Sequence, residues 1–177
     1  GDHAGQAGLD EGGSKGMTTI VTDGKTVAAD GLICYGQEKG AQSVRKIVVR
    51  TARDGKKRVF AFSGAHAMFA AVAEWFEQGA VPKDVPTATD DGWSMLVFEA
   101  HRNVNVFSTC PYPCEFSGVF GIGTGSSYAI GAVFAGASPE KAVLVASRLD
   151  RDTGGKIFVV NIAEALGIDV GVAEAAE

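Results

Sequence analysis

Three side chains near the start of the patterned sequence are of types that could support nucleophilic chemistry. Thr18 follows Met17 at the point where hydrophobic patterning begins. Asp30 lies at the end of a predicted strand, and Lys46 lies at the head of a later one. A threonine hydroxyl becomes a useful nucleophile only when a base takes its proton. By generic criteria this set is a weak pattern, and a surface-edge ion pair is the simpler interpretation of Asp30 and Lys46.

A glycine-rich segment, GIGTGS at residues 121–126, lies between a predicted strand and a predicted helix. A dinucleotide or phosphate loop would occupy such a place. The segment lacks the final glycine of G-x-G-x-x-G and the Lys-Ser/Thr of a P-loop, and its strand belongs to no βαβ unit. A tight strand-to-helix turn that needs glycine is therefore the favoured interpretation.

Histidine and cysteine offer little for hydrolysis or metal binding. One histidine lies in the N-terminal segment, one at a helix start and one in a turn: His3, His66 and His101. A serine or cysteine hydrolase would have to depend on one of the last two, and no H-E-x-x-H motif is present. The three cysteines cannot all pair, and C-x-x-x-C without a second ligand pair is a poor zinc site. We expect no metal and no cofactor, and a reducing cytoplasmic location.

Composition argues against two classes of function. The 177 residues carry 21 acidic and 16 basic side chains, for a net charge of −5 and a pI near 5.2. No basic surface for nucleic acid is expected from this balance. The longest apolar runs fall well short of the ~20 residues that a membrane-spanning helix needs. The 24 glycines, about twice the usual ~7%, predict many tight turns.

The first half of the patterned sequence predicts two hairpins before any helix. Residues 18–22 and 26–29 flank the dipeptide Asp23-Gly24, which suits a two-residue type I′ turn because both central positions need a positive φ. Residues 46–51 and 58–62 form a second pair around another Asp-Gly turn. Four antiparallel strands are therefore expected.

Helices and further strands follow in separate blocks. Residues 65–78 predict a helix that is apolar round most of its circumference, is covered on both sides and stops at Gly79. Ser138 is a predicted N-cap, with Pro139 at the first helical position. The remaining predicted elements are strands at 94–99, 103–107, 118–122 and 156–162 and helices at 126–135 and 139–149. This order favours an α+β fold with two sheets and helices packed outside them.

The two ends of the sequence differ from the rest. Residues 1–16 contain no aromatic or β-branched side chain. They are interpreted as a disordered tag or linker, with a propeptide as the alternative. Residues 17–177 are expected to form one domain, a size that a single core can support. The tail from about residue 163 is left unassigned.

Six short motifs resemble, in order, the proteasome β-type family and its bacterial HslV relatives. They are MTTIV at 17–21, ADG at 29–31, VRKI at 44–47, FSGA at 62–65, GTG at 123–125 and RDTGG at 151–155. The short chain is more similar to the HslV branch, and to cousins such as the β-proteobacterial proteasome homologue, than to eukaryotic subunits. The resemblance implies a four-layer αββα sandwich, the fold of N-terminal-nucleophile hydrolases, which agrees with the α+β order.

The chemistry that this resemblance implies is peptide-bond hydrolysis by an N-terminal nucleophile. Thr18 would attack the carbonyl, and its own α-amine, with an ordinary pKa of ~7.7–8.0, would take the proton. Lys46 would favour the neutral amine by like-charge repulsion and assist proton transfer. Asp30 would pair with Lys46 and fix its position.

Three further site residues are implied by the same resemblance. Gly64 maps to the backbone N–H that would stabilise the oxyanion, where a side chain would crowd the substrate. Thr124 falls where the family usually carries serine, and Asp152 falls where an aspartate supports the surroundings of the nucleophile. Phe62 and His66 fall near the specificity pocket, which Phe62 would narrow unless it is simply core.

The resemblance also implies assembly into homo-oligomeric stacked rings, whose chamber admits unfolded proteins or peptides. For HslV itself it implies an ATP-dependent unfoldase as partner. Because the α-amine must be free, we expect no activity while residues precede Thr18. Two other functions stay open: a small-molecule amidase with the same nucleophile, and a non-catalytic ring subunit. The first would need pocket-shaping insertions, and the second would not need Thr18, Asp30 and Lys46 together.

Overall fold

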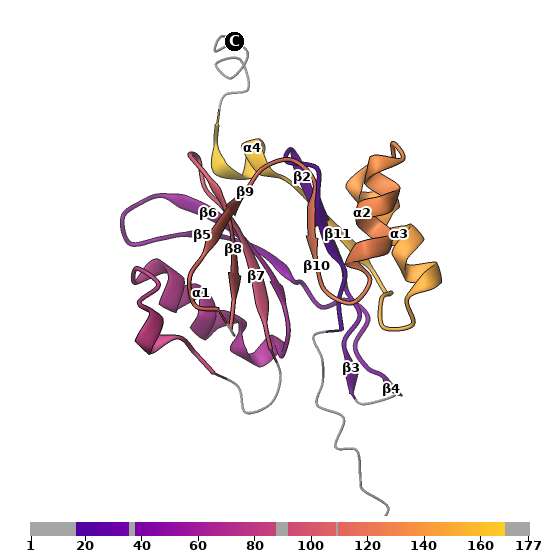
Figure 1. Ribbon diagram of the computed structural model, residues 1–177, viewed down its shortest axis with the longest axis horizontal. Coiled ribbons are helices and arrows are strands. Elements are labelled where there is room, and N and C mark those ends of the chain that lie inside the picture. Colours follow the sequence, from indigo (N-terminus) through magenta and orange to yellow (C-terminus); the bar gives the residue numbers. More distant parts are fainter. Residues whose placement is uncertain (1–16, 36–37, 88–91, 109, 169–177) are drawn as a thin grey trace, which may run out of the picture.

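The computed structural model describes residues 17–35, 38–87, 92–108 and 110–168. These residues form four layers, two antiparallel sheets packed face to face with helices on both outer faces (Figure 1). The order of layers is α1, the five-stranded sheet, the four-stranded sheet, and then α2 with α3. The predicted αββα sandwich is confirmed. The proposed extension at residues 1–16 and the part of the unassigned tail beyond residue 168 lie outside the described residues.

Both sheets are antiparallel throughout. The four-stranded sheet has the order β10-β1-β2-β11, and the five-stranded sheet has the order β5-β6-β7-β8-β9. The strands of the first are β1 Ile20–Thr22, β2 Thr26–Asp30, β10 Phe120–Ile122 and β11 Ile157–Asn161. Those of the second are β5 Ile47–Thr51, β6 Lys57–Ser63, β7 Ser94–Phe98, β8 Asn103–Phe107 and β9 Cys114–Phe116. A two-stranded ribbon, β3 Cys34–Tyr35 and β4 Glu38–Lys39, stands apart from both.

The first hairpin forms as predicted, but with a different turn. Asp23 N–H donates to Thr26 O at 3.3 Å, which makes Gly24 and Lys25 the two central residues. Only Gly24 of this pair has a positive φ, 91°, so the turn is not type I′. The Asp23 side chain instead accepts hydrogen bonds from the N–H groups of Lys25 and Thr26.

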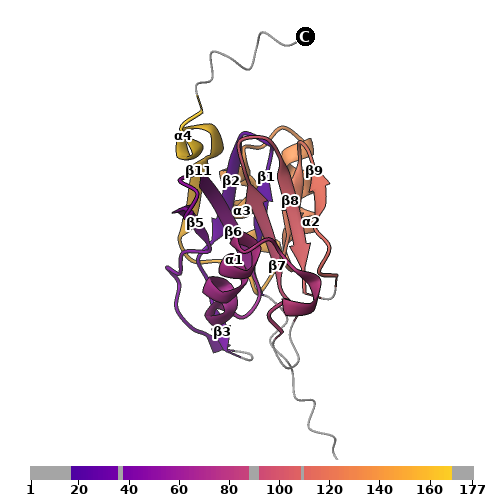
Figure 2. The same ribbon diagram turned by 90° about the vertical axis from the view of Figure 1, so that its left-hand side faces the viewer.

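Three helices, α1, α2 and α3, cover the outer faces of the two sheets (Figure 2), whereas α4 packs against the core between the sheets. Their bounds are α1 Phe69–Glu77, preceded by a 3₁₀ turn at His66–Met68, α2 Ser126–Phe134, α3 Pro139–Leu149 and α4 Ile162–Leu166, with a second 3₁₀ turn at Pro82–Asp84. Ser138 accepts a hydrogen bond from Lys141 N–H, which confirms the predicted N-cap of α3. The prediction that the first helix is covered on both sides is wrong for this chain, because Ala70, Ala71 and Glu74 are exposed.

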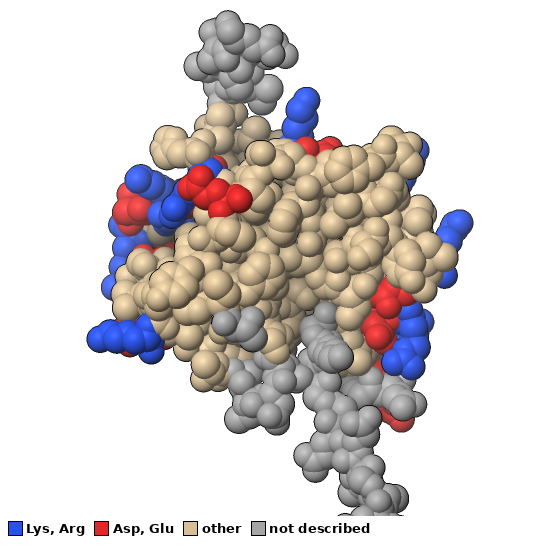
Figure 3. Space-filling view, viewed as in Figure 1, with Lys and Arg blue, Asp and Glu red and all other residues tan. Residues whose placement is uncertain are grey.

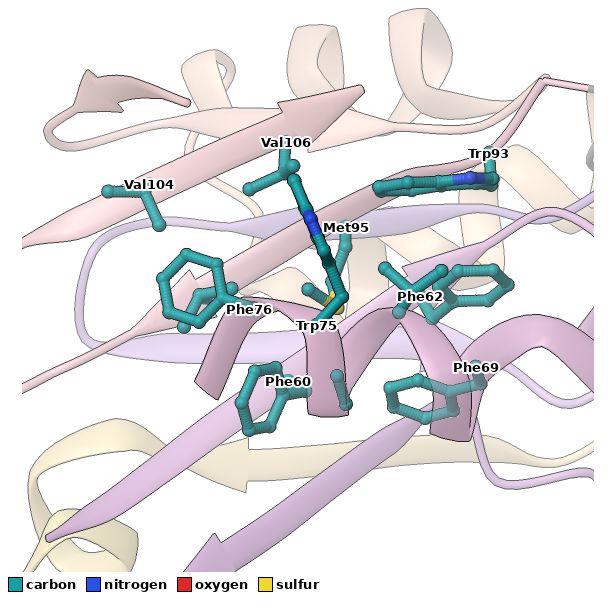
Figure 4. Packing of buried hydrophobic residues seen from close by; sticks show 12 residues of the cluster. Phe60, Phe62, Phe69, Trp75, Phe76, Trp93, Met95, Val104 and Val106 are labelled. Carbon is teal, nitrogen blue, oxygen red and sulfur yellow. The ribbon is translucent and has the colours of Figure 1, made fainter. Parts of the chain in front are cut away.

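The core has three parts because the central strands are buried on both faces. Successive side chains of a strand point to opposite faces. Phe60 and Phe62 of β6 therefore pack under α1 with Phe69, Trp75 and Trp93 (Figure 4), while Val59 and Ala61 fill the space between the sheets. The third part lies between the four-stranded sheet and the pair α2 and α3. The residues of the site lie at or next to the ends of the strands that enclose the inter-sheet core.

Candidate active site

A buried ion pair joins the end of β2 to the residue before β5. Lys46 Nζ lies 2.9 Å from Asp30 Oδ1, and the exposed fractions of the two residues are 3% and 0%. The ammonium also donates to Leu32 O at 2.6 Å and approaches Met17 O at 3.5 Å. Burial lowers the pKa of Lys46 below that of an ordinary lysine, and the charge of Asp30 opposes this shift. The surface-edge interpretation of the two residues is therefore wrong.

The Asp30 carboxylate also holds three segments of main chain. It accepts hydrogen bonds from Thr19 N–H at 2.9 Å, Leu32 N–H at 3.3 Å and Gly154 N–H at 3.1 Å. A buried polar group needs hydrogen-bond partners within the protein, and these donors supply them. The carboxylate thus ties the start of the described chain, the end of β2 and the loop after α3 to the lysine.

Thr18 lies between Lys46 and the turn after β10. The residue is 2% exposed. A Cβ atom at Gly123, where φ is 94°, would overlap the carbonyl oxygen of Thr18, so the turn packs directly on the main chain there. The carbonyl of Met17, which belongs to the peptide bond before Thr18, faces Lys46 Nζ on the other side. The structure therefore brings Thr18, Asp30 and Lys46 together.

A second carboxylate, that of Asp150 rather than Asp152, gathers hydroxyl groups beside this pair. Asp150 Oδ2 accepts from Thr124 Oγ1 at 2.8 Å and from Thr153 Oγ1 at 2.6 Å. Thr153 Oγ1 in turn lies 2.6 Å from Thr19 Oγ1. Asp152 pairs with the exposed Arg151 at 3.3 Å instead. The sequence alone could not separate two aspartates that flank one arginine before the same Thr-Gly-Gly turn.

Gly64 also has a structural reason to be glycine that the sequence did not predict. Its φ is 137°, and a Cβ atom there would lie 2.7 Å from Trp93 Cβ. Residues other than glycine rarely adopt that φ. Backbone conformation and the contact with Trp93 therefore require glycine, before any substrate is considered.

A pocket of about 380 Å³ opens beside Thr18. Thr18, Lys46 and Gly64 line it together with Met17, Ile33, Cys34, Phe62, Ala65, His66 and Ala67. Phe62 both lines the pocket and belongs to the core, since its ring stacks on Phe69 at 5.1 Å between centroids. Burial, and then repulsion by Lys46, lowers the pKa of His66 and favours the neutral imidazole. Burial raises the pKa of the Cys34 thiol, and Asp152 adds to this shift, so the neutral thiol is favoured too.

Solved structures provide the comparison with known proteins. No family model matches the sequence, and no curated protein matches it. Eukaryotic HslV from Trypanosoma brucei is 20% identical, with a TM-score of 0.62 over 81% of this chain and 97% of that one. This chain has the HslV fold. At that identity the similarity establishes the fold and leaves the chemistry to the residues themselves.

Two structures of BPH, the bacterial proteasome homologue, from Thiobacillus denitrificans have the same fold. One is BPH alone, 21% identical with a TM-score of 0.57 over 82% of this chain and 97% of that one. The other is BPH in complex with epoxomicin, 18% identical with a TM-score of 0.57 over 82% and 98%. These matches support the resemblance to the HslV and proteasome type that the motifs indicate. Among the described residues, no helix is long and apolar enough to cross a membrane.

Proposed function

We propose that this chain is a threonine-type peptidase subunit in which Thr18 becomes the nucleophile once the residues before it are removed. The observation that carries the proposal is the buried Lys46–Asp30 pair, whose ammonium lies 3.5 Å from the carbonyl of the Met17–Thr18 peptide bond. A buried charge pair contributes little to stability compared with apolar packing. A charged pair placed at this peptide bond within the HslV fold therefore has a catalytic interpretation.

The reaction follows from the positions of these groups. With Thr18 at the N-terminus, its α-amine takes the proton of Oγ1 as the oxygen attacks a peptide carbonyl. Lys46 keeps that amine in its neutral form by repulsion and assists the proton transfer, and Asp30 holds Lys46 in place. The N–H of Gly64 is the proposed donor to the oxyanion. The amine then returns the proton to the leaving group, and water hydrolyses the ester on Thr18.

The residues before Thr18 block this chemistry. While Met17 is attached, the nitrogen of Thr18 is an amide and cannot accept a proton. Met17 also lines the pocket that a substrate would enter. We therefore propose that the chain becomes active only after cleavage between Met17 and Thr18.

Ring assembly is the second part of the proposal. Five large apolar side chains on α2 and α3 are exposed, and the three with the largest exposed fractions are Tyr128 at 47%, Leu149 at 60% and Phe134 at 75%. The surface over α2 in Figure 3 carries no charged side chain. Apolar surface of this kind is typical of contacts between subunits. Stacked homo-oligomeric rings would confine Thr18 to a chamber that unfolded chains enter, with an ATP-dependent unfoldase as the proposed partner.

The test uses the chain that begins at Thr18, epoxomicin as the probe, and intact mass as the readout. An epoxyketone closes a ring with both the hydroxyl and the α-amine of an N-terminal threonine. We expect one label per Thr18-initiated chain, and none on the Thr18→Ala variant or on the chain that retains residues 1–17. Absence of label on a folded, assembled Thr18-initiated protein would refute the peptidase and favour a non-catalytic ring subunit.

A further inference from the structure

We infer that Thr19, the residue after the proposed nucleophile, is a positioning residue that links the Asp30 and Asp150 carboxylates. Through this link it holds the α-amine of Thr18 close to Lys46 Nζ. The inference rests on the proposed function and adds to it a residue that no step of the reaction uses. Thr19 does not line the pocket beside Thr18, and it acts through its neighbours.

Thr19 is held at three points. Its N–H donates to Asp30 Oδ1 at 2.9 Å, and its carbonyl accepts from Asp30 N–H at 3.1 Å. Its hydroxyl lies 2.6 Å from Thr153 Oγ1. The residue is fully buried. A strand pairing would need only the main-chain contacts, so the hydroxyl bond is an addition to what the sheet requires.

The turn after β10 is shaped round this hydroxyl. A Cβ atom at Gly125 would overlap Thr19 Oγ1 and would lie 2.7 Å from Thr153 Oγ1. Glycine at this position is therefore what allows the two hydroxyls to meet beneath the turn. The turn also carries Thr124, which donates to Asp150.

The hydrogen bond between the Thr19 and Thr153 hydroxyls joins the Asp30–Lys46 pair to the hydroxyl groups round Asp150. On one side, Asp30 binds Lys46. On the other side, the Thr153 hydroxyl donates its hydrogen to Asp150. The oxygen of that hydroxyl can therefore accept a hydrogen bond from the Thr19 hydroxyl. Gly154 N–H also reaches Asp30, but that contact does not orient the Thr153 side chain. The hydroxyl of Thr19 does contact that side chain, and Thr19 is covalently bonded to Thr18.

The experiment compares Thr19→Val, Thr19→Ser and Thr22→Val in the Thr18-initiated chain, by the rate of epoxomicin labelling as a function of pH. Valine keeps the shape of threonine and removes the hydroxyl, whereas serine keeps the hydroxyl. Thr22 is the matched control, because it is also buried, and it ends the strand β1 that Thr19 precedes. Its Oγ1 donates to Thr26 O at 2.8 Å.

We expect Thr19→Val to label about tenfold more slowly or worse, as expected for a misplaced nucleophile. Its rate should also need a higher pH, because an amine that moves away from Lys46 loses the repulsion that lowers its pKa. Thr19→Ser should restore most of the rate and the original pH profile. Thr22→Val should lower stability and leave rate and profile unchanged.

Thr153→Val removes the other half of the same hydrogen bond and serves if Thr19→Val fails to fold. It should shift the profile in the same direction, and the double variant should label no more slowly than the slower single variant. If the losses of labelling rate in the two single variants multiplied in the double variant, the inference would be overturned. It would also be overturned if the rate and pH profile of Thr19→Val equalled those of the parent. Both outcomes presuppose a parent that labels, so they leave the proposed function standing; a parent that does not label refutes that function itself.

Discussion

Lys46 Nζ and Asp30 Oδ1 lie 2.9 Å apart where neither side chain has appreciable contact with solvent. Each group is the counter-charge of the other, and protein atoms supply the rest of their polar contacts. Two carbonyl groups accept from the ammonium, and three backbone N–H groups donate to the carboxylate. The pair is therefore sensitive to the loss of either partner.

Replacing Asp30 by asparagine should destabilise the protein strongly. The change leaves the buried Lys46 ammonium without a counter-charge, a situation that costs about 3–5 kcal/mol in other proteins. The free energy of unfolding, measured by urea denaturation, should fall by about that amount. Asp54→Asn is the control, since Asp54 is exposed in the β5–β6 turn, and similar losses for both variants would contradict the expectation.

Lys46→Arg separates charge from proton transfer. Arginine keeps the positive charge and can still pair with Asp30, but it does not give up its proton. Labelling of the Thr18-initiated chain by epoxomicin should slow by about 10²-fold or more, with the fold retained by circular dichroism. Lys57→Arg makes the same change at an exposed position of β6 and should leave the rate intact. An active Lys46→Arg variant would remove Lys46 from the proposed proton transfer.

Asp150→Asn and Asp152→Asn distinguish the two aspartates of the turn after α3. Only Asp150 accepts from the hydroxyls of Thr124 and Thr153. Loss of the charged acceptor should slow labelling by roughly 5- to 100-fold, the equivalent of about 1–3 kcal/mol. Asp152→Asn should have little effect, because its carboxylate faces the solvent-exposed Arg151. The reverse order of the two rates would restore the assignment that the sequence motif suggested.

Gly64→Ala tests the physical reason for glycine at the proposed oxyanion donor. Strain from a positive φ should cost about 1–3 kcal/mol of unfolding free energy, and overlap with Trp93 should add to it. Gly79→Ala is the matched control, because Gly79 has a φ of 105° and open space where a Cβ would lie. Denaturation midpoints should rank wild type above Gly79→Ala and Gly79→Ala above Gly64→Ala. Equal losses would mean that Trp93 yields to the methyl group.

The family motifs named residues that the structure brings together, Thr18, Asp30 and Lys46, and the alternation of apolar residues predicted most of the sheets. The strands that the sequence missed, β3, β4 and β9, have two or three residues each, which is too short for a period of two to be recognised. The first helix was predicted to be covered on both sides because its apolar content is high. Small alanines on its outer face account for that error, since they are tolerated in solvent.

The sequence alone therefore predicted features that depend on residues close together in the chain. The hairpins and the Ser138 cap follow from propensities that act over a few positions, and Thr18, Asp30 and Lys46 were singled out by the resemblance of short motifs to a known family. The meeting of Thr19 with Thr153, 134 positions away, follows from neither. The same is true of the hydroxyl contacts of Asp150 and of the requirement for glycine opposite Trp93. These contacts arise because two sheets stack and bring distant turns together. A sequence pattern does not show which distant groups will face each other.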